Sequence, residues 1–234
     1  MANSKTAKKD TKSAIMDAAE IVMAEHGVDG ATISQIVSEA GANIAAIHYH
    51  FNSREGLLDA TLMRHKGFVA LRLKKMIKEL DESGRTPTPM DIANIIVNPR
   101  IDFLVEKGEA GRRSTRFLAR LQFDRRNQSD GKALHDHMTR KHFPEIRVKM
   151  HELISKACPE LGEEERQQRL TMSFDILFHY LTNADFMKTE WDSDGHHNEM
   201  LQGTTNLKTF IAGGLAAPVS KLEEQTETLE INHD

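Results

Sequence analysis

The spacing of apolar residues along the chain predicts helices almost throughout. From residue 11 apolar side chains recur every three or four positions, and the pattern stops at Gly27, which indicates one amphipathic helix. Two shorter patterns follow, over residues 32–40 and 44–50, with Gly41 between them. Two short helices joined by a tight turn form a helix-turn-helix. Strand-like alternation is scarce, so the expected fold class is all-α.

The turn between the two short helices is specified by its chemistry. Thr32 can cap the first helix, and Gln35 can reach back to it from three residues later. Gly41 can adopt the left-handed conformation that ends a helix, and Asn43 can accept from a free amide of the second helix. The sequence therefore predicts where each helix begins and where the chain bends.

The second short helix is expected to have an apolar outward face. Ile47 and Phe51 lie one turn apart and should point inward with Ala42. The opposite side then carries almost no charge, with Ile44, Ala45, His48 and Tyr49. Such a face is expected to contact a partner. The alternative is that Ile44 and Tyr49 pack on a neighbouring domain.

Beyond this motif, one long helix is expected from residue 53 to about residue 80, and as a rigid element it would transmit displacement between domains. Residues 81–89 form a proline- and glycine-containing linker. Further helices are expected at residues 90–108, 112–126, 131–157, 163–190 and 199–214. Pro99 and Pro144 should break or kink two of them, because proline removes a helical donor.

The charge distribution divides the ends of the chain from its middle. We expect a basic arm (1–10), a helix-turn-helix domain (11–56), a larger helical domain (57–217) and an acidic tail (218–234). The net charge is −4, yet lysines cluster in and just after the arm and glutamates in the tail. One basic end could therefore face an anion such as DNA. An unstructured solubilising leader is an equally good interpretation of the arm.

Composition excludes several classes of protein. Cys158 is the only cysteine, so an intrachain disulfide and a four-cysteine metal site are excluded. Neither a signal-like leader nor an apolar stretch of membrane-spanning length is seen, so a cytoplasmic protein without membrane association is expected. No nucleophile elbow or phosphate-binding glycine loop occurs, and we expect neither enzymatic activity nor a cofactor.

Several motifs in residues 11–60 occur in a familiar order: Ile15 with Ala18 and Ala19, Gly27, Thr32 with Ile36, Ala40 with Gly41, Ile47 to Phe51, and Ser53 with Glu55. In this order and spacing the stretch resembles the N-terminal domain of the tetracycline-repressor (TetR) family of bacterial transcription regulators. The resemblance implies a homodimeric repressor that binds palindromic double-stranded operator DNA. It also implies a C-terminal ligand-binding and dimerisation domain, through which a small, largely apolar effector would release the operator.

The resemblance further implies which residues contact DNA. Phosphate contacts are expected from Thr32, Ser34, Tyr49, His50 and Arg54, and base-edge contacts from Ile44, Ala45, Ala46 and His48. Asn43 also belongs to the expected DNA-binding set. The family usually has a polar residue or glycine where Ile44 and Ala45 stand, and often tyrosine at position 48. Because the apolar side chains can contact only apolar groups, His48 is the one obvious hydrogen-bonding reader. Shape and half-site spacing are expected to supply much of the specificity.

A ligand pocket is expected between residues 115–123 and 174–186, which mix apolar and polar side chains. Its expected lining is Arg116, Phe117, Arg120, Leu121, Phe178, His179 and Asn183. Arg120 could orient an acidic head group. The run from Phe117 to Leu121 resembles that of fatty-acyl-responsive members of the family, which implies a fatty-acyl compound or another apolar acid as effector. The alternatives are that these segments are mostly core, which is the interpretation that their pattern favours, and that Arg120 is a surface charge or pairs with a nearby carboxylate.

Dimer contacts are expected on the last two long helices, which could pair as a four-helix bundle, through Leu170, Phe174, Leu177, Leu181, Leu207, Phe210 and Ile211. The alternative is that both stripes are buried in one chain. The histidines show no metal-binding spacing, the strongest candidates being His135, His137, His142, His196 and His197, so no metal is expected. A helical sensor or adaptor that binds protein through its apolar outward helix is the alternative function.

Overall fold

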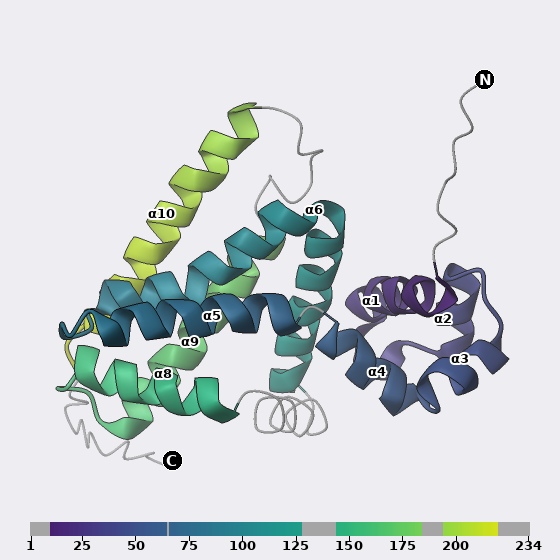
Figure 1. The fold of residues 1–234 in the computed structure, drawn as a ribbon, viewed down its shortest axis with the longest axis horizontal. Helices are drawn as coiled ribbons and strands as arrows, with labels where there is room; N and C mark the ends of the chain where they lie inside the picture. Colours follow the sequence, from purple (N-terminus) through teal and green to yellow (C-terminus); the bar gives the residue numbers. More distant parts are fainter. Residues whose placement is uncertain (1–9, 65, 128–143, 184–193, 220–234) are drawn as a thin grey trace, which may run out of the picture.

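The computed structural model describes residues 10–64, 66–127, 144–183 and 194–219, and the regular elements within these ranges are all helices (Figure 1). The N-terminal unit contains α1 (Thr11–Gly30), α2 (Ile33–Glu39), α3 (Ile44–Phe51) and α4 (Arg54–Met63). The larger body contains α5 (Lys66–Glu82), α6 (Pro89–Asn127), α8 (Pro144–Ala157), α9 (Glu163–Asn183) and α10 (Asp194–Ala216). The predicted all-α fold is confirmed.

The turn chemistry of the helix-turn-helix is confirmed in detail. Thr32 and Gln35 form a capping box, with the Thr32 amide donating to Gln35 Oε1 at 2.8 Å and the Gln35 amide donating to Thr32 Oγ1 at 3.2 Å. Gly41 has a positive φ of 60°, as a left-handed helix end requires. The Asn43 side chain accepts from the Ala46 amide at 2.9 Å and so caps α3.

The N-terminal unit is built around a core that α1 shares with α2, α3 and α4. The first helix bends at Gly27 (φ 76°, ψ 167°), where the sequence pattern stops, although helical turns continue to Gly30. From α4, Leu57, Leu58 and Leu62 are buried in this same core. The N-terminal core therefore extends past residue 56, where we had expected the domain to end.

The prediction of a single long helix after the helix-turn-helix is wrong. The expected helix is replaced by two helices, because α4 ends at Met63 and α5 begins at Lys66. The Arg64 amide bonds to Thr61 O at 3.3 Å, a tighter turn than the α-helical spacing. The Arg64 guanidinium meanwhile reaches to α1, where it donates to Ser13 Oγ at 2.8 Å. The end of α4 is therefore fixed to the N-terminal unit.

The longest helix, α6, bends at Gly108 and continues through Pro99. Gly108 has φ 53° and ψ −124°, which only glycine adopts readily. Of the break or kink predicted at Pro99, the break is wrong, because the backbone there stays helical while Ile95, Ile96 and Val97 hold that turn in the core. Pro144 is the first residue of α8, a position where its missing amide costs nothing.

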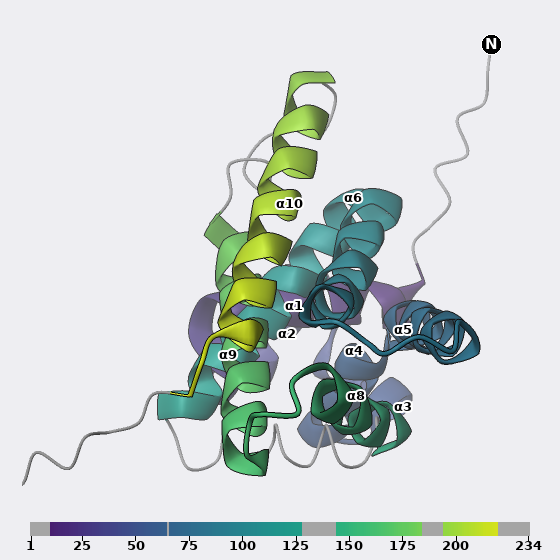
Figure 2. The same ribbon diagram turned by 90° about the vertical axis from the view of Figure 1, so that its left-hand side faces the viewer.

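The larger body has its own apolar core between α5, α6, α8, α9 and α10. In both ribbon views α10 lies along α6 and α9, and α8 lies against α5 and α9 (Figures 1 and 2). Among the described helices, none combines the length and apolar character needed to cross a membrane. Expectations for residues 1–9, 128–143, 184–193 and 220–234, which include the acidic tail, fall outside the described residues.

Most of the stripe expected to form the dimer contact belongs to this core. The prediction is wrong for five side chains that are buried within the single chain, namely Leu170, Leu177, Leu181, Leu207 and Ile211. Phe174 is partly buried against the same core. Only Phe210 stays on the surface, with 65% of its area exposed. The alternative, in which both stripes are buried in one chain, therefore holds for most of them.

Candidate DNA-reading surface and interdomain cavity

The outward face of α3 is open to solvent. Ile44 is 51% exposed and Tyr49 is 85% exposed, whereas Ile47 and Phe51 are buried in the N-terminal core. The alternative, that Ile44 and Tyr49 pack on a neighbouring domain, does not describe this chain. Contiguous exposed apolar and aromatic side chains beside polar groups are typical of a binding surface.

One hydrogen bond sets the chemistry of His48. Its Nδ1 lies 3.3 Å from the backbone oxygen of Asn52, a residue with a positive φ of 69° at the end of α3. Because a carbonyl oxygen can only accept, Nδ1 must carry the proton in this contact. In the neutral ring Nε2 is then an acceptor directed away from the backbone. An acceptor can pair with the amino groups that adenine and cytosine present in the major groove.

The other residues expected to contact DNA differ in their exposure and in the contacts that they already make within the chain. Ser34 and Ala45 are exposed, and Thr32 and Asn43 are exposed but already engaged as helix caps. Ala46 and His50 are half-buried, and the His50 ring packs edge-on against Tyr49 at 4.8 Å between centroids.

The phosphate contact expected from Arg54 is corrected, because its guanidinium is already engaged within the chain. Its guanidinium donates to the backbone oxygens of Val28 and Ala31, the second at 3.3 Å. It therefore ties the start of α4 to the link between α1 and α2. A basic group that spacing alone did not place is Lys12, whose ammonium lies 6.0 Å from the Phe51 ring centroid, at the end of α3. The other lysines of the basic arm precede the described residues.

The second half of α6 joins the N-terminal unit to the body. Phe117 and Leu121 are buried in the N-terminal core, among side chains from α1 to α4. A single helix therefore supplies side chains to both cores. The N-terminal unit is held by this contact as well as by the chain connection between α4 and α5.

Buried ion pairs surround this joint. Arg113 Nη2 lies 2.6 Å from Asp17 Oδ1, and Arg113 Nε lies 2.9 Å from Glu20 Oε2. Arg64 also pairs with Asp17. Glu20 is fully buried and Asp17 nearly so. Burial lowers the pKa of Arg64, with the like charge of Arg113 acting in the same direction and Glu20 opposing it.

A second charged contact lies where α1 bends. Arg120 Nε donates to Asp124 Oδ1 at 3.0 Å, one turn along α6. A Cβ atom added at Gly27 would lie 2.8 Å from Asp124 Oδ2 and 3.2 Å from Arg120 Nη2. The pair therefore packs directly on the Gly27 backbone. Glycine is required at this bend both for its positive φ and for this close approach.

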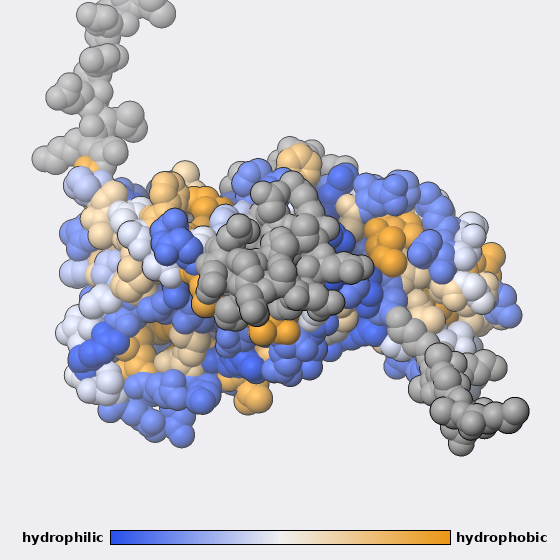
Figure 3. All heavy atoms as spheres, turned by 90° about the horizontal axis from the view of Figure 1, so that it is seen from above, coloured by the Kyte–Doolittle hydropathy of each residue, from blue (hydrophilic) through white to orange (hydrophobic). Residues whose placement is uncertain are grey.

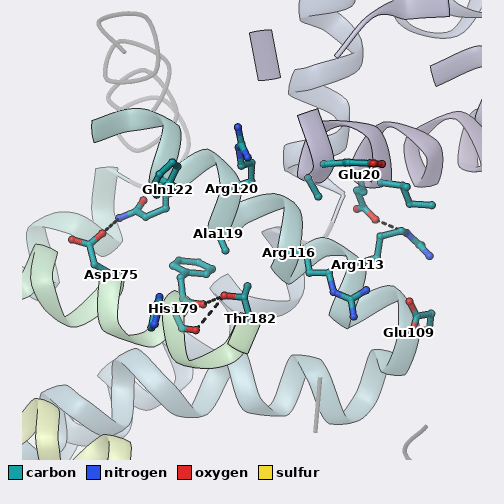
Figure 4. Close-up of a pocket in the computed structure, with 15 residues that line it drawn as sticks. Glu20, Glu109, Arg113, Arg116, Ala119, Arg120, Gln122, Asp175, His179 and Thr182 are labelled. Atoms are coloured by element: carbon teal, nitrogen blue, oxygen red, sulfur yellow. Dashed lines mark hydrogen bonds and ion pairs between the residues drawn. The ribbon is translucent and has the colours of Figure 1, made fainter. Parts of the chain in front are cut away.

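A cavity of about 630 Å³ lies between α1, α6 and α9. Figure 4 shows Glu20 and Arg113 at one end and Gln122 with Asp175 at the other. Its size is within the range of small-molecule sites. It is lined by Glu20, Ile21, Ala24, Glu25, Glu109, Arg113, Arg116, Ala119, Arg120, Gln122, Phe123, Asp175, Phe178, His179 and Thr182.

Polar groups in the cavity are mostly held by neighbours. Gln122 Nε2 donates to Asp175 Oδ1 at 3.0 Å, joining α6 to α9. Thr182 Oγ1 donates back to Phe178 O at 2.9 Å. The apolar wall consists of alanines with Ile21, Phe123 and Phe178. The cavity thus combines an apolar wall with polar side chains, several of which are held by neighbouring groups.

The structure brings together only part of the predicted ligand site. Arg116, Arg120, Phe178 and His179 line the cavity. Phe117 and Leu121 are corrected to core residues, because their side of α6 faces the N-terminal unit. Asn183 is not among the lining residues, and its amide donates to His179 O at 2.9 Å.

The wall formed by α1 is what sequence reasoning missed. The N-terminal unit contributes four lining residues that are far from α6 and α9 in the chain, namely Glu20, Ile21, Ala24 and Glu25. The only available signal was an acidic pair, Asp17 and Glu20, close to an otherwise apolar helical face. Among the described residues no group of three histidine, cysteine or carboxylate side chains is placed to hold a metal.

Comparison with known proteins agrees with this architecture. Residues 15–61 match the bacterial regulatory proteins of the tetR family, and residues 94–214 match the tetracycline repressor-like C-terminal domain. One relative is the uncharacterized HTH-type transcriptional regulator TtgW of Pseudomonas putida, which is 41% identical over 54 residues. This match covers 23% of the chain and 40% of the relative, so the chain spans about two fifths of that relative's length.

The two family matches correspond to the two cores of the structure. The first covers α2 and α3, most of α1 and most of α4, and the second covers the helices of the body from α6 onward. The C-terminal match alone covers more than half of the 234 residues. The chain therefore belongs to the TetR family of bacterial transcription regulators.

Proposed function

We propose that this regulator is a homodimeric repressor that binds a palindromic operator through α3 and leaves it when a small, largely apolar acid enters the interdomain cavity. The observation that carries the proposal is the position of the cavity. One of its walls is α1, which also packs on α2, α3 and α4. An occupant therefore touches the DNA-binding unit directly.

Switching follows from the same geometry. The N-terminal unit is held on the body by Phe117 and Leu121 and by the ion pairs of Arg113. An occupant that separates α1 from α6 and α9 would rotate α3 relative to the body and change the distance between the two recognition helices. Because α4 and α5 are separate helices, this contact replaces the rigid helix as the route of coupling. Operator should weaken ligand binding by the same factor as ligand weakens operator binding, typically about 5 to 150-fold.

The outer faces of α9 and α10 support a homodimer. Met172, Leu201 and Phe210 are exposed by 59%, 48% and 65% respectively. In the view of Figure 3 the described surface is mostly polar, with apolar side chains in small separate areas. We therefore place the dimer contact on these exposed side chains of α9 and α10 rather than on the buried leucines.

The DNA proposal is tested with two variants of α3. Tyr49→Ala should lower affinity for selected and random duplexes alike, because a phosphate contact carries no base information. His48→Phe should mainly reduce discrimination, and the position that loses its preference should prefer adenine or cytosine. Fluorescence anisotropy against DNA selected from a random pool measures both, with Leu71→Ala on the exposed face of α5 as control.

Several outcomes would contradict the docking. Unchanged affinity of Tyr49→Ala for both duplexes would show that the exposed face of α3 does not contact DNA as proposed. A preference for guanine or thymine at the position read by His48 would contradict its acceptor role. Wild-type binding should weaken steeply with added salt, because phosphates release counterions. Binding insensitive to salt would favour the protein-binding adaptor.

The dimer contact is tested at Phe210. Phe210→Asp should yield monomers and abolish operator binding together, since a two-fold site needs recognition helices about 34–36 Å apart. Leu71→Asp introduces the same charge at a similarly exposed position on α5 and should leave the dimer intact. Sedimentation velocity measures both variants. A dimeric Phe210→Asp protein would move the contact elsewhere.

A further inference from the structure

Arg100, in the first half of α6, has no carboxylate partner in the described part of the chain. No hydrogen bond or ion pair joins its guanidinium to another described residue, and its Cζ lies 5.3 Å from the centroid of the Phe178 ring. The neighbouring arginines of the same helix differ. Arg112, Arg113 and Arg120 each pair with a carboxylate.

The surroundings of Arg100 disfavour an uncompensated charge. The residue is half-buried, and one turn away on either side Val97 and Leu104 are fully buried in the core of the body. Burial lowers the pKa of Arg100 to about 10, so the group remains charged at neutral pH. Charged groups in such surroundings are normally paired, and an aromatic face only partly replaces a carboxylate. This position is therefore suited to an anion supplied from outside the chain.

Phe178 connects Arg100 with the cavity. The same ring that lies beneath the guanidinium also lines the space between α1, α6 and α9. Phe178 therefore borders both the guanidinium and that space, and an occupant would reach Arg100 by displacing this ring.

We propose that Arg100 binds the carboxylate head of the effector, whose apolar body fills the cavity beside Phe178, Ile21 and Phe123. This inference rests on the proposed function and names the chemistry of its effector. A guanidinium matches a carboxylate through two parallel hydrogen bonds. Arg120, our first expectation for this role, is already paired with Asp124 and packed on Gly27.

The test compares matched acids and alcohols. Hexanoate, octanoate, decanoate and dodecanoate are titrated by calorimetry, each beside the alcohol of the same chain length. At least one acid should bind the wild-type protein about tenfold more tightly than its alcohol, as expected for a charge-assisted pair. Arg100→Met should abolish this difference while leaving alcohol binding unchanged. Arg100→Lys, which keeps the charge but loses the fork, should retain part of it.

A control and a second measurement separate this role from a structural one. Arg72→Met removes a surface arginine of α5 and should keep the preference for acid. Without ligand, Arg100→Met should melt at the same or a higher temperature, because a charge set against the apolar core is removed. A lower melting temperature would show that Arg100 is structural and would overturn the inference.

Failure of the inference can be told apart from failure of the proposed function. Operator binding without ligand depends on α3, and Arg100→Met should leave it unchanged. If no acid binds more tightly than its alcohol, or if Arg100→Met keeps the preference, the anchoring role of Arg100 is overturned while operator binding stands. If the wild-type protein did not bind any operator specifically, the proposed repressor function would be overturned instead.

Discussion

The two halves of α6 are packed in different ways. Before Gly108, the helix is buried in the core of the body through Ile92, Ile95, Ile96 and related apolar side chains. After Gly108, it meets the N-terminal unit through the buried Phe117 and Leu121 and the partly buried Leu118, set among ion pairs. One half has a continuous apolar contact, and the other has a joint that depends on charge.

This difference indicates which contact is fixed and which can respond. Apolar packing is non-directional, whereas buried ion pairs offset their desolvation only when their geometry is kept. A small displacement therefore costs the charged joint more than the apolar contact. The residues of α6 that line the cavity all belong to the charged half, and Arg100 of the apolar half borders it only through Phe178. An effector can therefore act on the N-terminal joint while the body keeps its core.

The largest effect on stability is expected from replacing two fully buried phenylalanines, one in each half of α6. Phe117→Ala and Phe103→Ala should each lower the free energy of unfolding by about 3–5 kcal/mol, through lost burial and a new cavity. Only Phe117→Ala should also weaken DNA binding in conditions where both proteins stay folded. Calorimetric unfolding and DNA titration measure the two effects. Equal loss of DNA binding would mean that the halves are not distinct.

The next test removes the central cation of the joint. Arg113→Met should cost about 3 kcal/mol of unfolding free energy, because Asp17 and Glu20 would lose a buried partner. Arg72→Met is a matched control, since Arg72 also joins two carboxylates but on the surface, and should cost under about 2 kcal/mol. Denaturant unfolding measures both. Similar costs would show that burial gives the joint no special role.

A smaller effect is expected at the bend of α1. Gly27→Ala should cost about 2 kcal/mol, from its positive φ and from the clash with Asp124. Gly84→Ala has a similar φ of 67° but nothing within 4 Å of the added carbon, and should cost about 1 kcal/mol. The difference between their thermal unfolding measurements reports the contact of α6. No difference would contradict the close packing.

The smallest effect concerns the start of the apolar half. Hydrogen bonds from Arg85 and Thr88 hold the pKa of Asp91 well below its ordinary value of 3.8. A lowered folded-state pKa stabilises the native protein above the ordinary value, and this contribution is lost as pH falls below it. Asp91→Asn should therefore lower stability at neutral pH and flatten the acid side of the stability curve, because only the wild-type protein loses this contribution as pH falls. If the variant showed the same dependence of unfolding free energy on acid pH in urea titrations, the lowered pKa of Asp91 would not contribute to stability.

Much of the N-terminal unit could be predicted from the sequence because its decisive contacts are local. The caps at Thr32 and Asn43 involve residues three positions away, and Gly41 acts through its own backbone. The inward positions Ile47 and Phe51 follow from helical spacing alone. The break after Met63 was missed, because the Arg64 partner that accompanies it, Asp17, lies on another helix.

In the rest of the molecule the sequence determined that there are helices and which faces are apolar, whereas the tertiary structure decided what those faces meet. Periodicity identifies an apolar stripe but not its partner, so Leu177 and Leu207 could equally have formed a core or a dimer contact. Phe117 points into the N-terminal core only because Gly108 redirects α6. The cavity needs α1, α6 and α9 together, and no local spacing relates them. The pairing of Arg113 with Asp17, and the position of Arg100 beside a ring and away from every described carboxylate, likewise arise from long-range packing.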